Sequence, residues 1–309
     1  MITRVAQRFA AGLLAVLVAA CAGRETEALI AAPGRLPPAA RVEAVPFYPQ
    51  GDKACGPASL AMVLVWSGMS TSPDALSAMV YTPGREGSLA SDLLGAARRQ
   101  GRLAVPVHGL PAVLAEVAAG HPVLVFQNLG LEMAPVWHFA VAVGYDLPSR
   151  QIILNSGFDE GLRLPLDTFE HTWARSGRWA VVVLPADQLP ATGQEADVVE
   201  AAAGLERAGA GAAAARAYEA VLSRWSGNQA AAIGLGNVRY AMGDLAGAEA
   251  AFRRATETDA GSAAAWNNLA HVLHEQGRRP EARVAATKAV ELAGMNGAYA
   301  ETWTAVFAE

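Results

Sequence analysis

The sequence predicts an α+β domain followed by an all-α stack of repeats, and three observations support this. Residues 42–187 mix short apolar runs with Gly and Pro, which is typical of helices and strands in one domain. Beyond the short polar segment 188–197, strand-like runs disappear and alanine dominates. Gly209, Gly243 and Gly277 are then spaced by 34 residues, a period typical of helical repeats.

The composition excludes several classes of protein. The chain has 309 residues, enough for about two domains of roughly 100–200 residues each. Hydrophobic residues make up 52% and charged residues 17%, so the chain can bury a core and wholesale disorder is excluded. A net charge of −5 without a Lys/Arg-rich block argues against nucleic-acid partners. Two cysteines are too few for a disulfide scaffold, an iron–sulfur cluster or a four-cysteine zinc site.

Residues 1–20 are predicted to be an export signal. Arg4 and Arg8 precede the apolar stretch Ala10–Ala20, which is too short to span a bilayer. The stretch continues into Leu-Val-Ala-Ala-Cys, which resembles a bacterial lipobox. The resemblance implies cleavage before Cys21 and acylation of its thiol. The alternative is an ordinary signal peptide cut at a nearby small residue.

A lipid-anchored protein of the cell envelope is therefore expected. Residue 22 is Ala rather than the Asp that favours retention in the inner membrane, so the outer membrane, facing the periplasm, is preferred. Several Pro and Gly residues among alanines and charges predict a lipidated tether without a core of its own. The predicted order is signal 1–20, tether 21–41, α+β domain 42–187, linker 188–197 and repeats 198–309.

The tail repeats a pattern of small residues around its glycines. Gly236 and Ala248 around the second glycine correspond to Ala270 and Ala282 around the third, positions that let two antiparallel helices approach closely. The period and pattern resemble the tetratricopeptide repeat, with about three repeats and a capping helix over 297–309. Such stacks present a concave face to peptides, so a protein partner is expected. A generic Ala-rich bundle is the alternative.

Cys55 is the candidate nucleophile. Pro57 suits the first turn of a helix, and the apolar stretch that follows predicts a buried helix that ends at Gly68. Cys55 then lies at the helix N-terminus, where the macrodipole and free N–H groups favour a thiolate and lower the pKa of the thiol. The alternative is an inert buried cysteine.

His138 is the candidate base. It lies in the strand-like run 136–145, where a period of two places it on one face with Ala140, Ala142 and Gly144. Small neighbours leave room for a helix end beside the imidazole. A hydrogen-bonded core histidine is the alternative. A metal hydrolase is disfavoured because the one histidine pair with ligand spacing, His271 and His274, falls in the repeats away from other ligands.

Asn155 is the candidate for orienting His138. It falls at the end of the next predicted strand, 151–155, and 17 residues after the histidine. An Asn or Asp at this place can accept a hydrogen bond from the imidazole and fix its tautomer. Asp146 and Asp159 are alternatives, although Asp146 sits in the connecting turn, where Asp is common for turn reasons.

Three strings together resemble the bacteriocin-processing cysteine peptidase family. They are Gln-x4-Cys-Gly-Pro-Ala-Ser-Leu from residue 50, His-Phe from residue 138 and Asn-Ser-Gly from residue 155. The best-known members are papain-like domains that cut leader peptides after a Gly-Gly pair at the head of ABC exporters. The resemblance covers roughly residues 44–185. The similarity is greatest to bacterial lipoproteins that join such a domain to tetratricopeptide repeats.

The resemblance implies a papain-like fold and a role for each site residue. Cys55 would be the nucleophile, His138 the general acid and base, and Asn155 the orienting group. Gln50 would donate its side-chain N–H to the oxyanion. The chain departs from the exporter-linked members, which mostly carry Asp at the orienting position. It also lacks a P-loop string and membrane helices after the domain, so cytoplasmic leader cleavage is not implied.

The sequence thus favours a thiol peptidase in the cell envelope that acts on a peptide or protein substrate. No metal or cofactor is expected for this chemistry. A second hypothesis keeps the site but changes the acceptor or the bond, giving transpeptidation, deamidation or isopeptide cleavage. A third is a binding lipoprotein whose repeats act on a degenerate protease fold. The complete Cys, His, Asn and Gln set argues against degeneracy.

Overall fold

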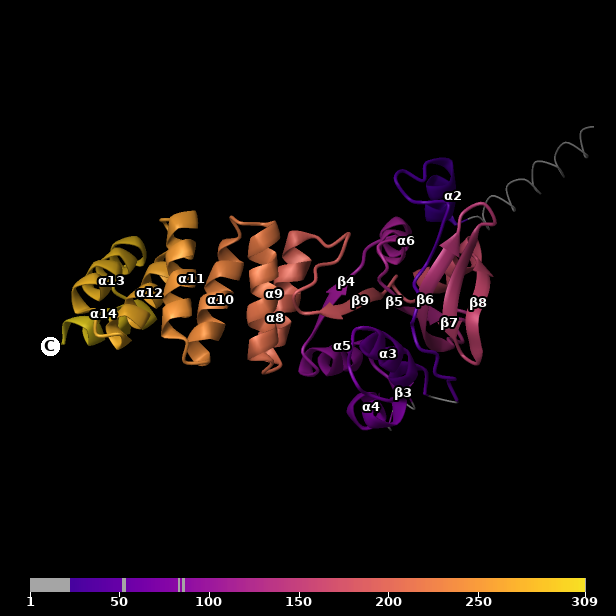
Figure 1. Ribbon diagram of the computed structural model, residues 1–309, viewed down its shortest axis with the longest axis horizontal. Helices are drawn as coiled ribbons and strands as arrows, with labels where there is room; N and C mark the ends of the chain where they lie inside the picture. The colour runs from indigo at the N-terminus through magenta and orange to yellow at the C-terminus, as the bar shows by residue number, and fades with distance from the viewer. Residues whose placement is uncertain (1–22, 52–53, 83, 85–86, 309) are drawn as a thin grey trace, which may run out of the picture. The chain divides into compact units, whose positions relative to one another are not determined.

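The computed structural model describes residues 23–51, 54–82, 84 and 87–308. The chain forms two compact units (Figure 1). The first contains the described residues up to Ala96, together with Val105–Val183 and Pro190–Thr192. The second contains Ala97–Ala104, Leu184–Leu189 and the rest of the chain from Gly193. The boundary between the two units is therefore crossed more than once along the chain, because Ala97–Ala104 belongs to the second unit.

The chain contains both helices and strands up to residue 185, as predicted for an α+β domain. The helices are α2 (Arg24–Ala31), α3 (Cys55–Trp66), α4 (Pro73–Val80), α5 (Ala90–Arg99), α6 (Leu110–Ala118) and α7 (Leu166–Ala174). The strands are β1 (Ala39–Arg41), β2 (Tyr81–Thr82), β3 (Gly87–Ser88), β4 (Arg102–Pro106), β5 (Val123–Asn128), β6 (Trp137–Asp146), β7 (Gln151–Ser156), β8 (Asp159–Pro165) and β9 (Ala180–Pro185). The α+β prediction is confirmed.

A sheet with β6 near its middle organises the domain. The strand order is β4-β9-β5-β6-β7-β8, and β1 also pairs with β6. β5 pairs with β6 as far as Ala142, and β1 pairs with the last part of the same strand, from Gly144 to Asp146. A Cβ on Gly144 would lie 3.0 Å from the Ala40 carbonyl oxygen, so the glycine allows this close approach. β6 is thus paired along its length.

α3 is a core helix that packs against β6. All its residues from Ala58 to Leu64 are fully buried, which explains why the sequence of this helix shows no polar face. Burial on every side fixes the position of the helix, and with it the position of Cys55 at its first residue.

The segment expected to be a tether is folded onto the domain. α2 begins where the side chain of Glu170, 3% exposed, accepts from the backbone N–H groups of Glu25 and Thr26 at 3.0 and 2.8 Å. Glu25 in turn accepts from the N–H of Leu110 at the start of α6, at 2.6 Å. The prediction that residues 21–41 form a tether without a core of its own is therefore wrong for residues 23–41, which contain α2 and β1. The residues that α2 contacts are more than 80 positions away in the sequence, so a local sequence pattern does not reveal them.

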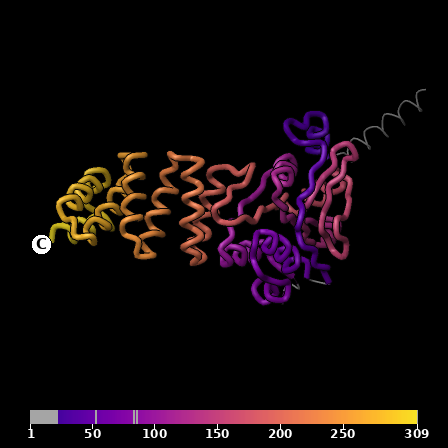
Figure 2. The backbone as a smooth tube through the Cα atoms, viewed as in Figure 1, coloured from indigo at the N-terminus to yellow at the C-terminus, as the bar shows by residue number. Residues whose placement is uncertain are grey.

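The second unit contains successive antiparallel helices (Figure 2). They are α8 (Glu195–Arg207), α9 (Gly211–Arg224), α10 (Gln229–Ala241), α11 (Leu245–Thr258), α12 (Ala263–Glu275), α13 (Arg279–Ala293) and α14 (Gly297–Phe307). Gly209, Gly243 and Gly277 adopt φ values of 76°, 79° and 73° in the turns between paired helices, a region that favours glycine. The predicted repeat stack is confirmed.

Candidate active site

The Cys55 thiol lies between the first turn of α3 and the start of β6. The side chain is half-buried. The backbone N–H groups of Phe139 on β6, of Gly56 and of Cys55 itself lie close enough to the sulfur to lower the pKa of the thiol. Since Phe139 follows His138 directly, the contact brings the thiol to the strand that carries the candidate base.

Burial keeps both members of this pair neutral. It raises the pKa of the Cys55 thiol above its ordinary value, and the three N–H groups that lower this pKa do not compensate. Burial also lowers the pKa of His138. The expectation of a thiol pKa below the ordinary value is therefore wrong for the resting site, because desolvation outweighs the favourable backbone N–H groups.

His138 is oriented by a serine. Its Nε2 lies 2.9 Å from the hydroxyl oxygen of Ser156 at the end of β7. The ring is thereby fixed through one nitrogen, and its other nitrogen, Nδ1, remains for contact with the thiol. Ser156 thus holds the place that the sequence analysis assigned to Asn155.

Asn155 points to the opposite face of the sheet. Its partner on β6 is Val141, and directly paired residues of antiparallel strands carry their side chains on the same face. Val141 and His138 are three positions apart along β6 and face opposite ways. The Asn155 side chain accepts instead from the N–H of Gly161 on β8, at 3.1 Å. The predicted contact between Asn155 and His138 does not occur among the described residues.

Gln50 joins the helix to the turn that follows Ser156. Its Nε2 donates to the hydroxyl of Ser59 at 2.9 Å, and its Oε1 accepts from the N–H of Gly157 at 3.0 Å. The backbone N–H of Gln50 also donates to the carbonyl of Gly157, at 2.8 Å. Ser59 lies one helical turn after Cys55, on the same side of α3. Gln50 is thus part of the same cluster, with one of its two side-chain N–H bonds committed to Ser59.

These contacts connect the residues around the thiol in one continuous network. It runs from α3 through Gln50 to the turn after β7, then through Ser156 to His138 and back to Cys55 through the amide of Phe139. The structure therefore brings together three of the four predicted residues and replaces the fourth. Ser59 was missed, although its spacing of four residues from Cys55 was available as a signal.

The two alternatives to Asn155 lie elsewhere. Asp146 accepts from the N–H of Ser149 at 3.0 Å in the turn between β6 and β7, a role that lowers its pKa. That turn is at the opposite end of β6 from His138. Asp159 begins β8 and is exposed. Neither carboxylate contacts His138 among the described residues.

Gly56 permits the close approach of a second hydroxyl. A Cβ at this position would lie 2.6 Å from the Cβ of Ser88 on β3, closer than real side chains approach. The Ser88 hydroxyl is buried and lacks a hydrogen-bond partner within the described residues. The glycine next to Cys55 is therefore required by packing as well as being part of the motif.

Exposed apolar side chains precede His138 and follow Ser156 along the chain, and we call this set the apolar collar. Four belong to the loop between β5 and β6, a fifth is the first residue of β6, next to His138, and the sixth follows Gly157. The collar comprises Leu129, Leu131, Met133, Val136, Trp137 and Phe158, of which Met133 is the most exposed at 89%. The Asn128 side chain holds the loop by accepting from the N–H groups of Gly130 and Val136. The apolar side chains are thus presented on an ordered loop.

The remaining sequence expectations concern groups away from this cluster. Cys21, the predicted lipidation site, lies outside the described residues. Cys55 is a free thiol. The part of the chain that the structure describes contains no group of three or more His, Cys, Asp or Glu side chains placed to hold a metal ion. None of its helices combines the length and apolar character needed to cross a membrane.

An α+β domain with this cluster, joined to a helical repeat stack, defines a class of peptidase-related proteins. Residues 42–181 match the family described as Peptidase_C39 like. Residues 205–267 and 239–301 match the tetratricopeptide repeat. The chain therefore carries a domain of the C39-like peptidase family followed by tetratricopeptide repeats.

Solved structures resemble each half. A putative C39-like peptidase from Bacillus anthracis is 20% identical and covers 47% of this chain and 97% of its own, with a TM-score of 0.40. The peptidase domain of Streptococcus ComA, a bifunctional ABC transporter, is 22% identical over 46% of this chain and 98% of its own, with a TM-score of 0.37. The Yersinia enterocolitica chaperone SycD in complex with a YopD peptide is 22% identical over 36% of this chain and 85% of its own, with a TM-score of 0.33. No curated protein matches the chain.

Proposed function

We propose that the C39-like domain is a cysteine peptidase in which Cys55 attacks and His138 transfers protons. The observation that supports this is the placement of the thiol against the amide of Phe139, while Ser156 fixes the adjacent His138 through Nε2. A nucleophile and a base oriented by a third group are the components that thiol catalysis needs.

The reaction would start from a neutral pair. As the sulfur of Cys55 bonds to the substrate carbonyl carbon, Nδ1 of His138 takes the thiol proton. The resulting imidazolium is held by Ser156 through Nε2–H and gives a proton to the departing amine. Water then attacks the thioester, His138 takes its proton, and the sulfur leaves with that proton. The backbone N–H of Cys55 and the second N–H of the Gln50 amide are the proposed donors to the oxyanion.

The apolar collar suggests the kind of peptide that the site takes. Exposed large apolar side chains in one patch commonly mark a binding surface. The collar lies on both sides of the catalytic cluster along the chain, before His138 and after Ser156. We therefore propose that apolar residues flank the bond that is cut.

The setting of the reaction is also a proposal. Cys21 would be acylated and would hold the protein in the cell envelope, at the outer membrane. The repeats would recruit a protein substrate or partner. Fatty-acid incorporation that depends on Cys21, and membrane release of Cys21→Ser, test the anchor. A wild-type protein that incorporates no fatty acid would refute it.

A catalytically silent binding protein is the second candidate, and the pKa shifts favour it. A raised pKa of Cys55 and a lowered pKa of His138 both work against a thiolate at neutral pH. An acyltransferase or deamidase would use the same residues as the peptidase and differ in the acceptor or the bond.

The test is covalent labelling with a peptidyl acyloxymethyl ketone that carries apolar residues. Cys21→Ser serves as the starting chain, since Cys55 is then the only cysteine. Labelling is expected in this chain and lost in the additional variant Cys55→Ser. His138→Ala should lower its rate by about 10²-fold or more, the range typical of general acid–base catalysis. Labelling that ignores the His138 substitution would indicate a reactive surface thiol and support the silent candidate.

A further inference from the structure

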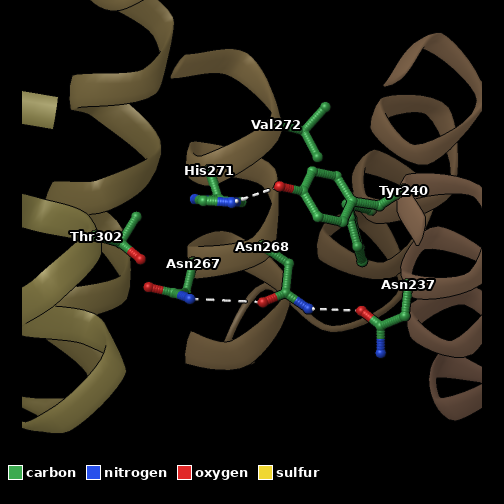
Figure 3. Close-up of a pocket in the computed structure, with 8 residues that line it drawn as sticks. Asn237, Tyr240, Asn267, Asn268, His271, Val272 and Thr302 are labelled. Carbon is green, nitrogen blue, oxygen red and sulfur yellow. Dashed lines mark hydrogen bonds between the residues drawn. The ribbon is translucent and has the colours of Figure 1, made fainter. Parts of the chain in front are cut away.

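A pocket lies among α10, α12 and α14 of the repeat stack (Figure 3). Its volume is about 270 Å³. Six polar side chains line it: Asn237, Tyr240, Asn267, Asn268, His271 and Thr302. The pocket lies within the second unit and shares no residue with the Cys55 cluster.

A row of asparagines leaves one oxygen without a donor. The amide of Asn268 donates to Oδ1 of Asn237 at 3.1 Å, so its own Oδ1 faces Asn267. Asn267 donates to that oxygen at 3.5 Å. The Oδ1 of Asn267 is then left over: it is buried without a hydrogen-bond partner in the described residues, on a side chain only 9% exposed. A buried acceptor without a donor costs free energy, so a ligand that donates here would be favoured.

His271 adds a second acceptor. The Tyr240 hydroxyl donates its single hydrogen to the Glu275 carboxylate. The contact of 2.9 Å between that hydroxyl and Nε2 of His271 therefore requires Nε2–H as the donor. In the neutral ring, Nδ1 is then an acceptor. Figure 3 shows this second ring nitrogen and the Asn267 oxygen on the side of the pocket toward Thr302.

The charges around the pocket favour a cation. α12 carries Glu275 as its only Asp, Glu, Lys or Arg, and α14 carries Glu301. The single such residue of α10 is Arg239, which is ion-paired with Glu219. Acceptors on helices whose single Lys or Arg is already ion-paired suit a ligand that has donors, no acceptors and a positive charge.

We propose that this pocket binds the basic head group of a lysine or arginine side chain in a partner polypeptide. Guanidinium and ammonium groups offer five and three N–H donors and no acceptor, which matches the open Asn267 oxygen and the His271 nitrogen. The Tyr240 ring adds an aromatic face for the cation. This inference rests on the proposed recruiting role of the repeats and gives the chemistry of what they recruit.

Ligand-observed NMR titration of the full chain tests the proposal. The chain carries Cys55→Ser so that no probe is cut. The probes are N-acetylated, C-amidated Ala-Ala-X-Ala-Ala peptides with arginine, lysine, citrulline or glutamate at X. The arginine and lysine peptides should bind about tenfold more tightly than the others, as expected for charge-assisted hydrogen bonds. Asn267→Leu should weaken the arginine peptide about tenfold, and Asn267→Asp should tighten it.

The control is Val284→Ala, at a side chain 69% exposed on α13, which should change nothing. Tighter binding of the basic peptides, lost in a folded Asn267→Leu chain, supports the proposal. Equal binding of the citrulline or glutamate peptide, absence of binding by all four peptides, or a folded Asn267→Leu chain that still binds arginine would overturn it. Labelling of Cys55 is measured separately, in the chain that retains this cysteine. A failed pocket and a failed peptidase assignment therefore give different results.

Discussion

The hydroxyl of Ser156 is a weak partner for the imidazole of His138. To leave Nδ1 free for the thiol proton, Nε2 must carry hydrogen and donate to the serine oxygen, 2.9 Å away. A neutral hydrogen bond of this kind contributes about 0.5–1.5 kcal/mol, whereas a bond to a charged group contributes roughly 1.5–3 kcal/mol. Ser156 therefore orients His138 but does little to stabilise an imidazolium. This agrees with the lowered pKa of the histidine.

The first prediction separates Ser156 from its neighbour. Ser156→Ala should slow labelling of Cys55 by about tenfold, because the ring loses the bond that fixes it. Asn155→Ala should leave the labelling rate within about twofold, since its oxygen serves the N–H of Gly161 on the other face, and should lower stability by about 1 kcal/mol. Labelling rates and urea unfolding measure the two effects. The reverse ranking would restore Asn155 as the orienting residue.

The second prediction concerns pH. Because burial raises the pKa of Cys55, the thiolate fraction is small at neutral pH and grows only above the ordinary pKa of a cysteine. In the Cys21→Ser chain, alkylation by iodoacetamide should therefore accelerate with pH to an apparent pKa above about 8.5. Ser156→Asp should shift this profile to lower pH, because a carboxylate favours the imidazolium and hence the thiolate. A plateau below pH 8 in the unsubstituted chain would contradict the pKa direction.

The sequence was sufficient to locate Cys55 and His138, but not to identify the residue that orients His138 or the direction of the thiol pKa shift. Cys55 and His138 could be located because each carries a local pattern: a proline in the first helical turn and a period of two along a strand. The choice between Asn155 and Ser156 depends on pairing between β6 and β7, where a one-residue difference moves a side chain to the opposite face. The thiol pKa depends on burial by distant elements, which no local pattern describes.

At the scale of elements, close approaches between backbones position the site. The first turn of α3 meets β3 at Gly56, where a Cβ would lie 2.6 Å from the Cβ of Ser88. The third prediction is that Gly56→Ala displaces β3 or the helix end, at a cost of about 1–3 kcal/mol, and slows labelling. Gly51→Ala is the matched control, because a Cβ there meets nothing within 4 Å. Equal unfolding free energies for the two variants would argue against this packing.

The repeats also depend on a glycine that allows two elements to pack closely. A Cβ on Gly236 of α10 would lie 2.4 Å from the Phe252 ring on α11. The fourth prediction is that Gly236→Ala destabilises the stack by about 1–3 kcal/mol, although alanine is the better helix former by about 1 kcal/mol. Gly227→Ala, in a turn where the added Cβ meets nothing within 4 Å, is the control. Thermal unfolding followed by circular dichroism compares them, and a more stable Gly236→Ala chain would refute the steric argument. This contact was predictable because a fixed period reveals which positions face each other.

At the scale of the whole molecule, α2 decides how the N-terminal part of the chain is attached to the C39-like domain. Glu170 caps the helix through two N–H bonds. Burial alone would raise the pKa of this carboxyl, but the N–H groups of Glu25 and Thr26 outweigh burial and hold it below its ordinary value. The cap therefore adds stability at neutral pH, and this contribution is lost as the pH falls below the ordinary pKa of Glu toward the lowered one.

The fifth prediction is that α2 detaches in acid before the domain unfolds. Hydrogen exchange at Glu25 and Thr26 should rise as the pH falls below about 4, relative to the intrinsic rates. Glu170→Gln should show raised exchange already at neutral pH and lose about 1 kcal/mol, since an amide offers one acceptor oxygen where the carboxylate offers two. Unchanged exchange in Glu170→Gln would show that apolar packing, not the cap, holds the helix.

The docking of α2 also bears on how far an active site in this domain could reach. The N–H of Gly23 is bonded to Asp167 at 3.1 Å, and Glu27 is paired with Arg150 in the turn after β6. If Cys21 is acylated, one residue separates the lipid from this docked segment. His138 lies at the other end of β6, eight residues from Asp146, or about 26 Å at roughly 3.3 Å per residue. A peptidase held in this way would search in two dimensions and reach only chains close to the bilayer, so delivery of substrate to the membrane surface would govern turnover.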